Sequence, residues 1–349
     1  AGPQSHLSDA LVNAIPSGTS ISAGGIELSD HVAKVSLNGT LPSDDRGKQL
    51  MAWEISQTLQ RSGRVNSVEI NVGGEALPSS GLPSQPSFDL DSAVALNSNG
   101  LVRIDGRSVS TRILPITPSS SASLPAVSPV SSSLLAWRED DRLILVDSST
   151  NATRVVDGSE GQYSPSIDRF GWVWDIPQGG NLRASRIDGQ NLAIASENQS
   201  LNGVSAVRVS PDGARALLLR QVGGSTSAWI AGIERRGSGE PIALTDPEPL
   251  AGLSTGVDDV SWAGRSTVVA VRQGGLRAGN DQVDEVSLVT VPVGGFPSVL
   301  ALPTGTQRLS AGSSSATMVI RGKDGNYQVR SGALWQSLEG NLRDVNFPG

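Results

Sequence analysis

The chain has 349 residues, with 27 Lys and Arg against 34 Asp and Glu, a formal net charge of −7 and no cysteine. This balance excludes the phosphate-neutralising surface of a nucleic-acid binder, and the lack of thiols excludes disulfides, thiolate metal sites and cysteine nucleophiles. A charged content of 17% together with 40 glycines favours many short strands over long charged helices.

Residues 1–76 predict a small α+β domain. Its first stretch, HLSDALVNAIP, has Leu7, Leu11 and Ile15 at helical spacing before a proline. TSISAGGIEL and VAKVSLNG follow as a predicted strand pair, and VNSVEINVGG is a predicted closing strand. A helix and strands of this kind form a domain in which the helix packs on a sheet.

A helix is predicted between these strands, in LPSDDRGKQLMAWEISQTLQRSG. Either Ser43 or Asp44 caps its start, and Gly63 ends it. Its apolar face consists of Met51, Ile55 and Leu59. Residues 77–87, LPSSGLPSQPS, have no hydrophobic periodicity and predict a linker.

A turn pattern recurs in the remainder, 88–349. In VRVSPDGARALLL a strand ends at Val209, Ser-Pro-Asp-Gly suits a type I turn, and a second strand follows. Similar patterns recur every 36 to 53 residues, and three more strands lie between them. The positions are Val127, Tyr163, Val209, Trp262, Leu309 and Phe347. Repeats of this length and content predict a β-propeller.

The last repeat position, in LRDVNFPG, has no strands after it. Conversely, three predicted strands within 92–114 have no strand with a repeat position before them: SAVAL, GLVRID and SVSTRIL. The C-terminal strand is therefore predicted to complete the first blade, which gives six blades and removes the free sheet edges. Counts of five and seven stay open, because two of the turns lack Pro-Asp-Gly.

No catalytic, cofactor-binding or metal-binding residue is predicted. His6 and His31 lie outside the propeller, and no Gly-x-Ser-x-Gly elbow accompanies them, which argues against a hydrolytic triad. Three acidic clusters, 43–45, 139–141 and 257–259, and the stretch 279–285 could bind metal or hold a carboxylate pair. Helix capping and turns between strands account for them better.

Six tryptophans follow the linker, and five of them lie on predicted strands. They are Trp137, Trp172, Trp174, Trp229, Trp262 and, near the outer edge of the last blade, Trp335. A sugar-binding platform is one interpretation. Burial between blades is the better one, because Trp gives a large apolar area to a core.

The stretch IPSGTSIS…HVAKVSLNG…LMAWEISQTLQRSGRVNSVEINVGG resembles the GerMN domain, first described in spore-germination proteins, over about residues 3–75. Together with the linker and the degenerate propeller it resembles the actinobacterial LpqB lipoprotein family. The resemblance implies an envelope protein on the extracytoplasmic face of the cell membrane, anchored through a lipidated N-terminal Cys that this sequence lacks. It also implies that the GerMN domain is truncated at its N-terminus.

The same resemblance implies a partner, the extracytoplasmic sensor region of an MtrB-like histidine kinase, and a non-enzymatic role in two-component signalling. No site residue carries over, so the partner-binding residues are unknown. An alternative is a module that binds cell-wall glycan or a small ligand at the mouth of the propeller. A third function, a propeller hydrolase, fits poorly with a propeller sequence that has no histidine.

Overall fold

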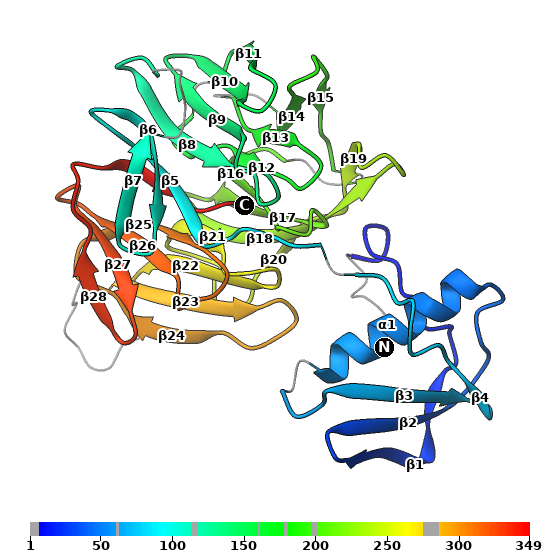
Figure 1. Cartoon of the computed structure of the whole chain (residues 1–349). Coiled ribbons are helices and arrows are strands. Elements are labelled where there is room, and N and C mark those ends of the chain that lie inside the picture. Colours follow the sequence, from blue (N-terminus) through cyan, green and yellow to red (C-terminus); the bar gives the residue numbers. More distant parts are fainter. Residues whose placement is uncertain are drawn as a thin grey trace. The chain divides into compact units, whose positions relative to one another are not determined.

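The structure is a computed structural model that describes residues 7–60, 63–84, 86–112, 118–159, 161–177, 181–196, 198, 201–274 and 286–349. It divides into two compact units, an N-terminal unit Ala1–Pro86 and a C-terminal unit Ser87–Gly349. Strands dominate, which confirms the mainly β class (Figure 1). No helix of the described ranges is long and apolar enough to cross a membrane.

The N-terminal unit is one helix packed on a four-stranded sheet of order β1-β2-β3-β4. Its elements are β1 (Ser20–Ser29), β2 (Val32–Asn38), α1 (Asp45–Gln60), β3 (Ser67–Val72) and β4 (Glu75–Ala76). α1 joins the parallel strands β2 and β3, and it buries Met51 and Ile55 in one core with Val35 and Ile70. Asp44 caps the helix, because its Oδ1 accepts a hydrogen bond of 2.7 Å from the Gly47 amide.

The stretch HLSDALVNAIP does not form the helix that its spacing suggests. Only one turn forms, in which the Leu11 amide donates to the Leu7 carbonyl at 2.9 Å. Asn13 Oδ1 then accepts a bond from the Ile15 amide, and Glu54 of α1 accepts one from the Ala14 amide, both at 3.0 Å. These side chains bind the amides that a continuing helix would need, so the helix stops.

The C-terminal unit has six antiparallel sheets within its described residues. The first contains β8 (Ala122–Val127), β9 (Leu134–Glu139), β10 (Arg142–Asp147) and β11 (Ala152–Asp157). The second contains β12 (Ser166–Ile167), β13 (Trp172–Asp175), β14 (Arg183–Arg186) and β15 (Asn191–Ala193). The third contains β16 (Val204–Val209), β17 (Arg215–Val222), β18 (Ser225–Arg235), β19 (Pro241–Leu244) and β20 (Glu248–Pro249).

The other three sheets follow the same plan. The fourth contains β21 (Val257–Trp262), β22 (Thr267–Gln273), β23 (Val286–Pro292) and β24 (Ser298–Ala301). The fifth contains β25 (Thr306–Ala311), β26 (Met318–Gly322), β27 (Tyr327–Ser331) and β28 (Leu334–Ser337). The sixth places the C-terminal strand β29 (Arg343–Asn346) beside β5 (Ser92–Asn97), followed by β6 (Gly100–Asp105) and β7 (Ser108–Arg112).

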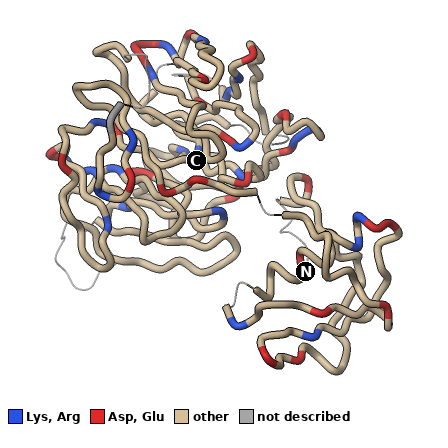
Figure 2. Tube along the Cα trace, viewed as in Figure 1, with Lys and Arg blue, Asp and Glu red and all other residues tan. Residues whose placement is uncertain are grey.

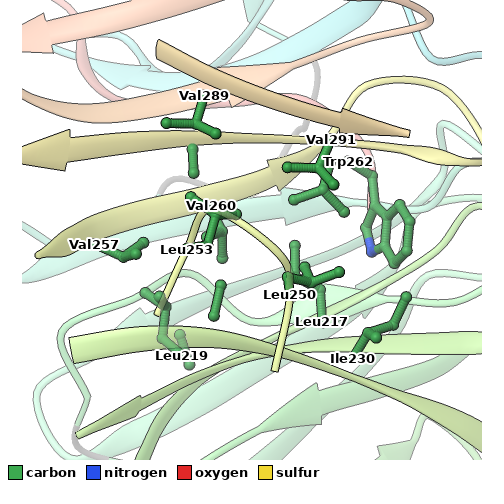
Figure 3. Close-up of a cluster of buried hydrophobic side chains, with 14 residues drawn as sticks. Leu217, Leu219, Ile230, Leu250, Leu253, Val257, Val260, Trp262, Val289 and Val291 are labelled. Carbon is green, nitrogen blue, oxygen red and sulfur yellow. The ribbon is translucent and has the colours of Figure 1, made fainter. Parts of the chain in front are cut away.

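The inner strands of the six sheets contact one another in the order β8, β12, β16, β21, β25 and β29, and β29 contacts β8 again. β29 pairs with β5 through Arg343 opposite Leu96 and Asn346 opposite Val94. Large apolar side chains fill the space between neighbouring sheets. In Figure 3, Leu217 and Ile230 of the third sheet lie in one cluster with Trp262 of the fourth.

A repeated hydrogen bond follows each of five inner strands. It runs from the residue after the strand to the start of the next strand, as from the Ser210 amide to the Arg215 carbonyl at 2.8 Å. The other donors and acceptors are Ser128 and Leu134, Asp168 and Trp172, Ala263 and Thr267, and Gly312 and Thr317. In the second and fifth sheets, this bond puts the repeat position at Ile167 and Ala311. The predicted positions Tyr163 and Leu309 are therefore wrong. Tyr-Ser-Pro and Leu-Ser-Ala-Gly resemble in sequence the turn that follows Val209, which is why the sequence pattern points to them.

Candidate functional site

A cavity of about 100 Å³ lies among the inner strands of the C-terminal unit. Residues of the inner strands β8, β16, β21, β25 and β29 line it, together with residues of β26, β27 and the segment before β12. Its polar and charged lining residues are Gln162, Tyr163, Ser164, Arg208, Asp259, Arg308, Ser310, Arg321, Tyr327, Asp344 and Asn346. The cavity is therefore a charged recess at the centre of the C-terminal unit, where five strands of the ring contribute.

Asp259 is the most deeply placed carboxylate of this cavity, with 3% of its surface exposed. Its oxygens accept hydrogen bonds from the backbone amides of Val260 and Leu309, both at 3.0 Å. The Leu309 amide belongs to β25, so this carboxylate joins the fourth and fifth sheets. Arg208 and Arg308 both attract it electrostatically.

Burial sets the protonation equilibria here. It raises the pKa of the Asp259 carboxyl, although Arg208, Arg308 and the two amides oppose the shift. Burial likewise lowers the pKa of the Arg208 guanidinium, against the attraction of Asp259. Both shifts indicate that water stabilises these charges poorly inside the cavity.

Two more arginines and two tyrosines line the cavity. The Arg308 guanidinium lies over the Tyr163 ring at 4.2 Å from its centroid, a cation–π contact. The Tyr163 hydroxyl donates to the Asp258 carbonyl at 3.1 Å, which fixes the ring. Arg321 lies on β26 opposite Tyr327, and its buried Nε has no hydrogen-bond partner within the described residues.

In and beside the cavity, polar side chains join neighbouring inner strands. Ser166 Oγ accepts a bond from the Val209 amide at 2.8 Å, and Ser310 Oγ accepts one from the Phe347 amide at the same distance. Ser310 also donates to Asn346 Oδ1 at 3.1 Å, and Asn346 donates to the Pro125 carbonyl at 3.2 Å. The chain itself ends near the middle of the ring, where a methyl group added to Gly349 would lie 3.5 Å from the Val209 carbonyl oxygen (Figure 1).

The acidic clusters take several places. Within 43–45, Asp44 caps α1, and within 139–141, Asp140 and Asp141 form the turn between β9 and β10. Within 257–259, Asp259 lines the central cavity. The stretch 279–285 lies outside the described residues. No group of three or more metal-ligating side chains occurs in the part of the chain that the structure describes.

The tryptophans pack mainly between sheets, as burial between blades predicts. Trp137, Trp172, Trp174 and Trp262 are at most 2% exposed, whereas Trp229 and Trp335 are partly exposed. Of the two histidines, His6 lies outside the described residues, and His31 is exposed in the turn before β2, with its ring bonded to the Arg64 carbonyl. His31 is not among the described residues that line the cavity. Figure 2 shows acidic and basic residues interspersed along the C-terminal unit.

The sequence analysis missed Arg208, Arg308, Arg321 and Tyr327 as site residues. A signal for some of them exists in the repeat. Three residues before each repeat position of the structure stand Leu124, Ser164, Ala206, Asp259, Arg308 and Asp344. Five of these six line the cavity. When the repeat positions are placed at Tyr163 and Leu309, the residues three positions earlier are different ones, and this shared feature of the repeats is not visible in the sequence.

Comparisons with known proteins agree with this architecture. A family model described as "Lipoprotein LpqB beta-propeller domain" matches residues 98–348, and one described as "Sporulation and spore germination" matches residues 1–78. A curated protein named Lipoprotein LpqB, from Streptomyces avermitilis, is 30% identical over 196 residues, which are 53% of this chain and 31% of that protein. The match thus spans about a third of the relative's length.

Among solved structures, a chain of a nidogen/laminin complex is similar with a TM-score of 0.51. It is 10% identical, and the similarity covers 73% of this chain and 97% of that one. At this identity the similarity concerns the fold alone.

Proposed function

The chain belongs to the family of the lipoprotein LpqB β-propeller domain, and from this we propose that it is a non-enzymatic envelope module that binds the extracytoplasmic sensor region of an MtrB-like histidine kinase. Binding to one conformational state of the kinase more tightly than to the other would shift its equilibrium and modulate two-component signalling. Location on the extracytoplasmic face of the cell membrane, through a lipid anchor, belongs to the same proposal.

The charged mouth of the central cavity supports this proposal best. Arg308 stacked on Tyr163 gives a cation and an aromatic ring held in fixed positions by the ring of sheets. Arginine and tyrosine are enriched among the residues that carry most of the energy of protein interfaces. We place the partner-binding residues at this mouth.

We further propose that residues 1–76 and 88–349 are separate domains joined by the linker 77–87. The GerMN-like domain would then act as a spacer or second binding module between the membrane anchor and the propeller. A rigid propeller at the end of such a spacer presents its loops to a membrane-bound partner.

A binding assay with the purified sensor region of the kinase tests the proposal. We expect a complex with the unaltered chain, and about tenfold weaker binding for Arg308→Gln, because a charged interface contact is lost. Arg142→Gln, at an exposed position of β10, is the matched control and should bind normally. Kinase reconstituted in vesicles, with the chain added on the sensor side, should change its autophosphorylation. Absence of both the complex and this change would refute the proposal.

A second candidate, binding of cell-wall glycan, is favoured by a groove of about 450 Å³ in the N-terminal unit. Its lining combines Trp53 with Gln57, Gln60 and Asn66 and contains no charged residue within the described part of the chain. An aromatic ring among amide groups suits a neutral, hydroxyl-rich ligand. Co-sedimentation with purified peptidoglycan tests it, and Trp53→Ala should abolish the binding while leaving the propeller mouth unaltered.

A further inference from the structure

The central cavity contains more cationic than anionic side chains. Arg208, Arg308 and Arg321 line it together with two carboxylates, Asp259 and Asp344. Each carboxylate already accepts backbone amides: Asp259 those of Val260 and Leu309, and Asp344 that of Leu124 at 3.1 Å. The excess of one positive charge among these lining groups, in a partly desolvated recess, favours the entry of an anion.

The arginines also keep donors available. Arg208 is 6% exposed and uses Nη1 to donate to the Ser164 carbonyl at 2.5 Å, while Arg308 donates to the Gln162 carbonyl at 3.4 Å. The buried Nε of Arg321 donates to no group among the described residues. A buried donor without a partner is costly, and each guanidinium has five N–H groups in a planar fork that matches an oxyanion.

The size of the cavity limits what it can hold. Its volume of about 100 Å³ leaves room for a compact group such as one carboxylate or phosphate. The two tyrosine rings and Val319 give the cavity an apolar part of its wall, and an apolar surrounding strengthens the attraction of such a group to the arginines.

We propose that the central cavity is a binding site for one compact oxyanion, a carboxylate or a phosphate group, held by Arg308 and Arg321 with Arg208 beneath. The site does not depend on the kinase partner, because all of its groups belong to this chain. The oxyanion comes either from a free small molecule or from the end of a peptide chain, and both present the same chemistry to the arginines.

The test is calorimetric titration of the whole chain with sodium acetate, sodium phosphate, and acetyl-diglycine with a free or an amidated C-terminus. Sodium chloride at equal ionic strength controls for screening. We expect saturable binding of one anion per chain, and a rise in the melting temperature of the C-terminal unit that chloride does not produce. Binding of acetate or phosphate identifies a free anion as the ligand, and binding of the free-acid peptide alone identifies a chain end.

Variants locate the site. Arg321→Gln should weaken binding about tenfold to a hundredfold, since it removes charge-assisted hydrogen bonds. Arg308→Gln, on another strand, should do the same, and it keeps the test decisive if Arg321→Gln does not fold. The exposed Arg142→Gln should bind as the unaltered chain does. The proposal is overturned if none of the three anionic probes binds better than chloride, or if both cavity variants bind normally. A failure to bind the kinase leaves these outcomes unaffected.

Discussion

Replacing Ser310 by Ala should weaken the contact between the last two sheets of the ring. Ser310 is 4% exposed, and its hydroxyl makes two hydrogen bonds, one to β29 and one to Phe347, the residue after β29. It accepts a bond from the Phe347 amide at 2.8 Å and donates one to Asn346 Oδ1 at 3.1 Å. Alanine has nearly the same volume but can make neither bond, so packing changes little while two buried polar groups lose a partner.

The size of the effect follows from these two groups. A buried donor or acceptor left without a partner costs about 1–3 kcal/mol. Asn346 keeps its bond to the Pro125 carbonyl, so its loss is partial. We therefore expect the free energy of unfolding of the C-terminal unit to fall by about 2–4 kcal/mol. In a unit of this size that corresponds to a melting temperature lower by about 5–10 °C.

Urea unfolding followed by near-ultraviolet circular dichroism measures this change, because four buried tryptophans report on the C-terminal unit. Ser287→Ala is the matched control. Ser287 is 5% exposed, and its side chain donates within its own sheet, to the Arg272 carbonyl at 3.3 Å. It should cost less than about 1 kcal/mol.

A double-mutant cycle with Asn346→Ala separates the pair from general packing, and we expect a coupling energy above about 0.5 kcal/mol. If Ser310→Ala costs no more than Ser287→Ala and the cycle shows no coupling, then the bonds between β25 and β29 do not stabilise the ring, and the reasoning fails.

Three further predictions concern other parts of the chain. Deletion of residues 340–349 removes β29 and exposes the edge of β5. We expect aggregation or a large loss of thermal stability. An unchanged melting curve would refute the six-blade arrangement that is closed by this strand. Ile55→Asp puts a charge into the core beneath α1, which costs several kcal/mol of stability. The N-terminal unit should become protease-sensitive while the C-terminal unit stays resistant. If both units lose their protease resistance together, they share one core. Because burial raises the pKa of Asp259, the native state binds its proton more tightly than the unfolded state does. Stability should therefore fall as pH rises above about 4, the carboxyl's unfolded value, and Asp259→Asn should lessen that fall in pH-dependent unfolding.

The sequence predicts the β architecture well because strand and turn chemistry repeat locally. Four strands per repeat and an orphan strand at the C-terminus can be identified from the pattern of apolar residues alone, and the structure pairs that strand with β5. The blade count and closure remain predictions for the truncation to test. The helix suggested at Leu7 fails because Asn13 and Glu54 bind its amides, and Glu54 lies far along the chain.

The cavity could not be predicted in the same way. Asp259 and Arg308 lie about 50 residues apart in sequence. They meet in the cavity because they occupy the same position of the repeat on adjacent inner strands. An error of four residues at Tyr163 and of two at Leu309 moves that position to other side chains. The site thus depends on an exact repeat register, whereas the fold tolerates an approximate one.

The pairing of β29 with β5 also bears on how the protein is made. In five of the sheets all strands follow one another in the chain, but the sheet of β5, β6 and β7 stays incomplete until β29 has been synthesised, long after β7. During that time β5, whose four central residues are buried in the finished ring, has an unpaired edge. Two nascent chains on one messenger could join through such edges. Slow synthesis of the repeats before β29 would lengthen this exposure, so a chaperone that shields β5 should matter most until β29 has been synthesised.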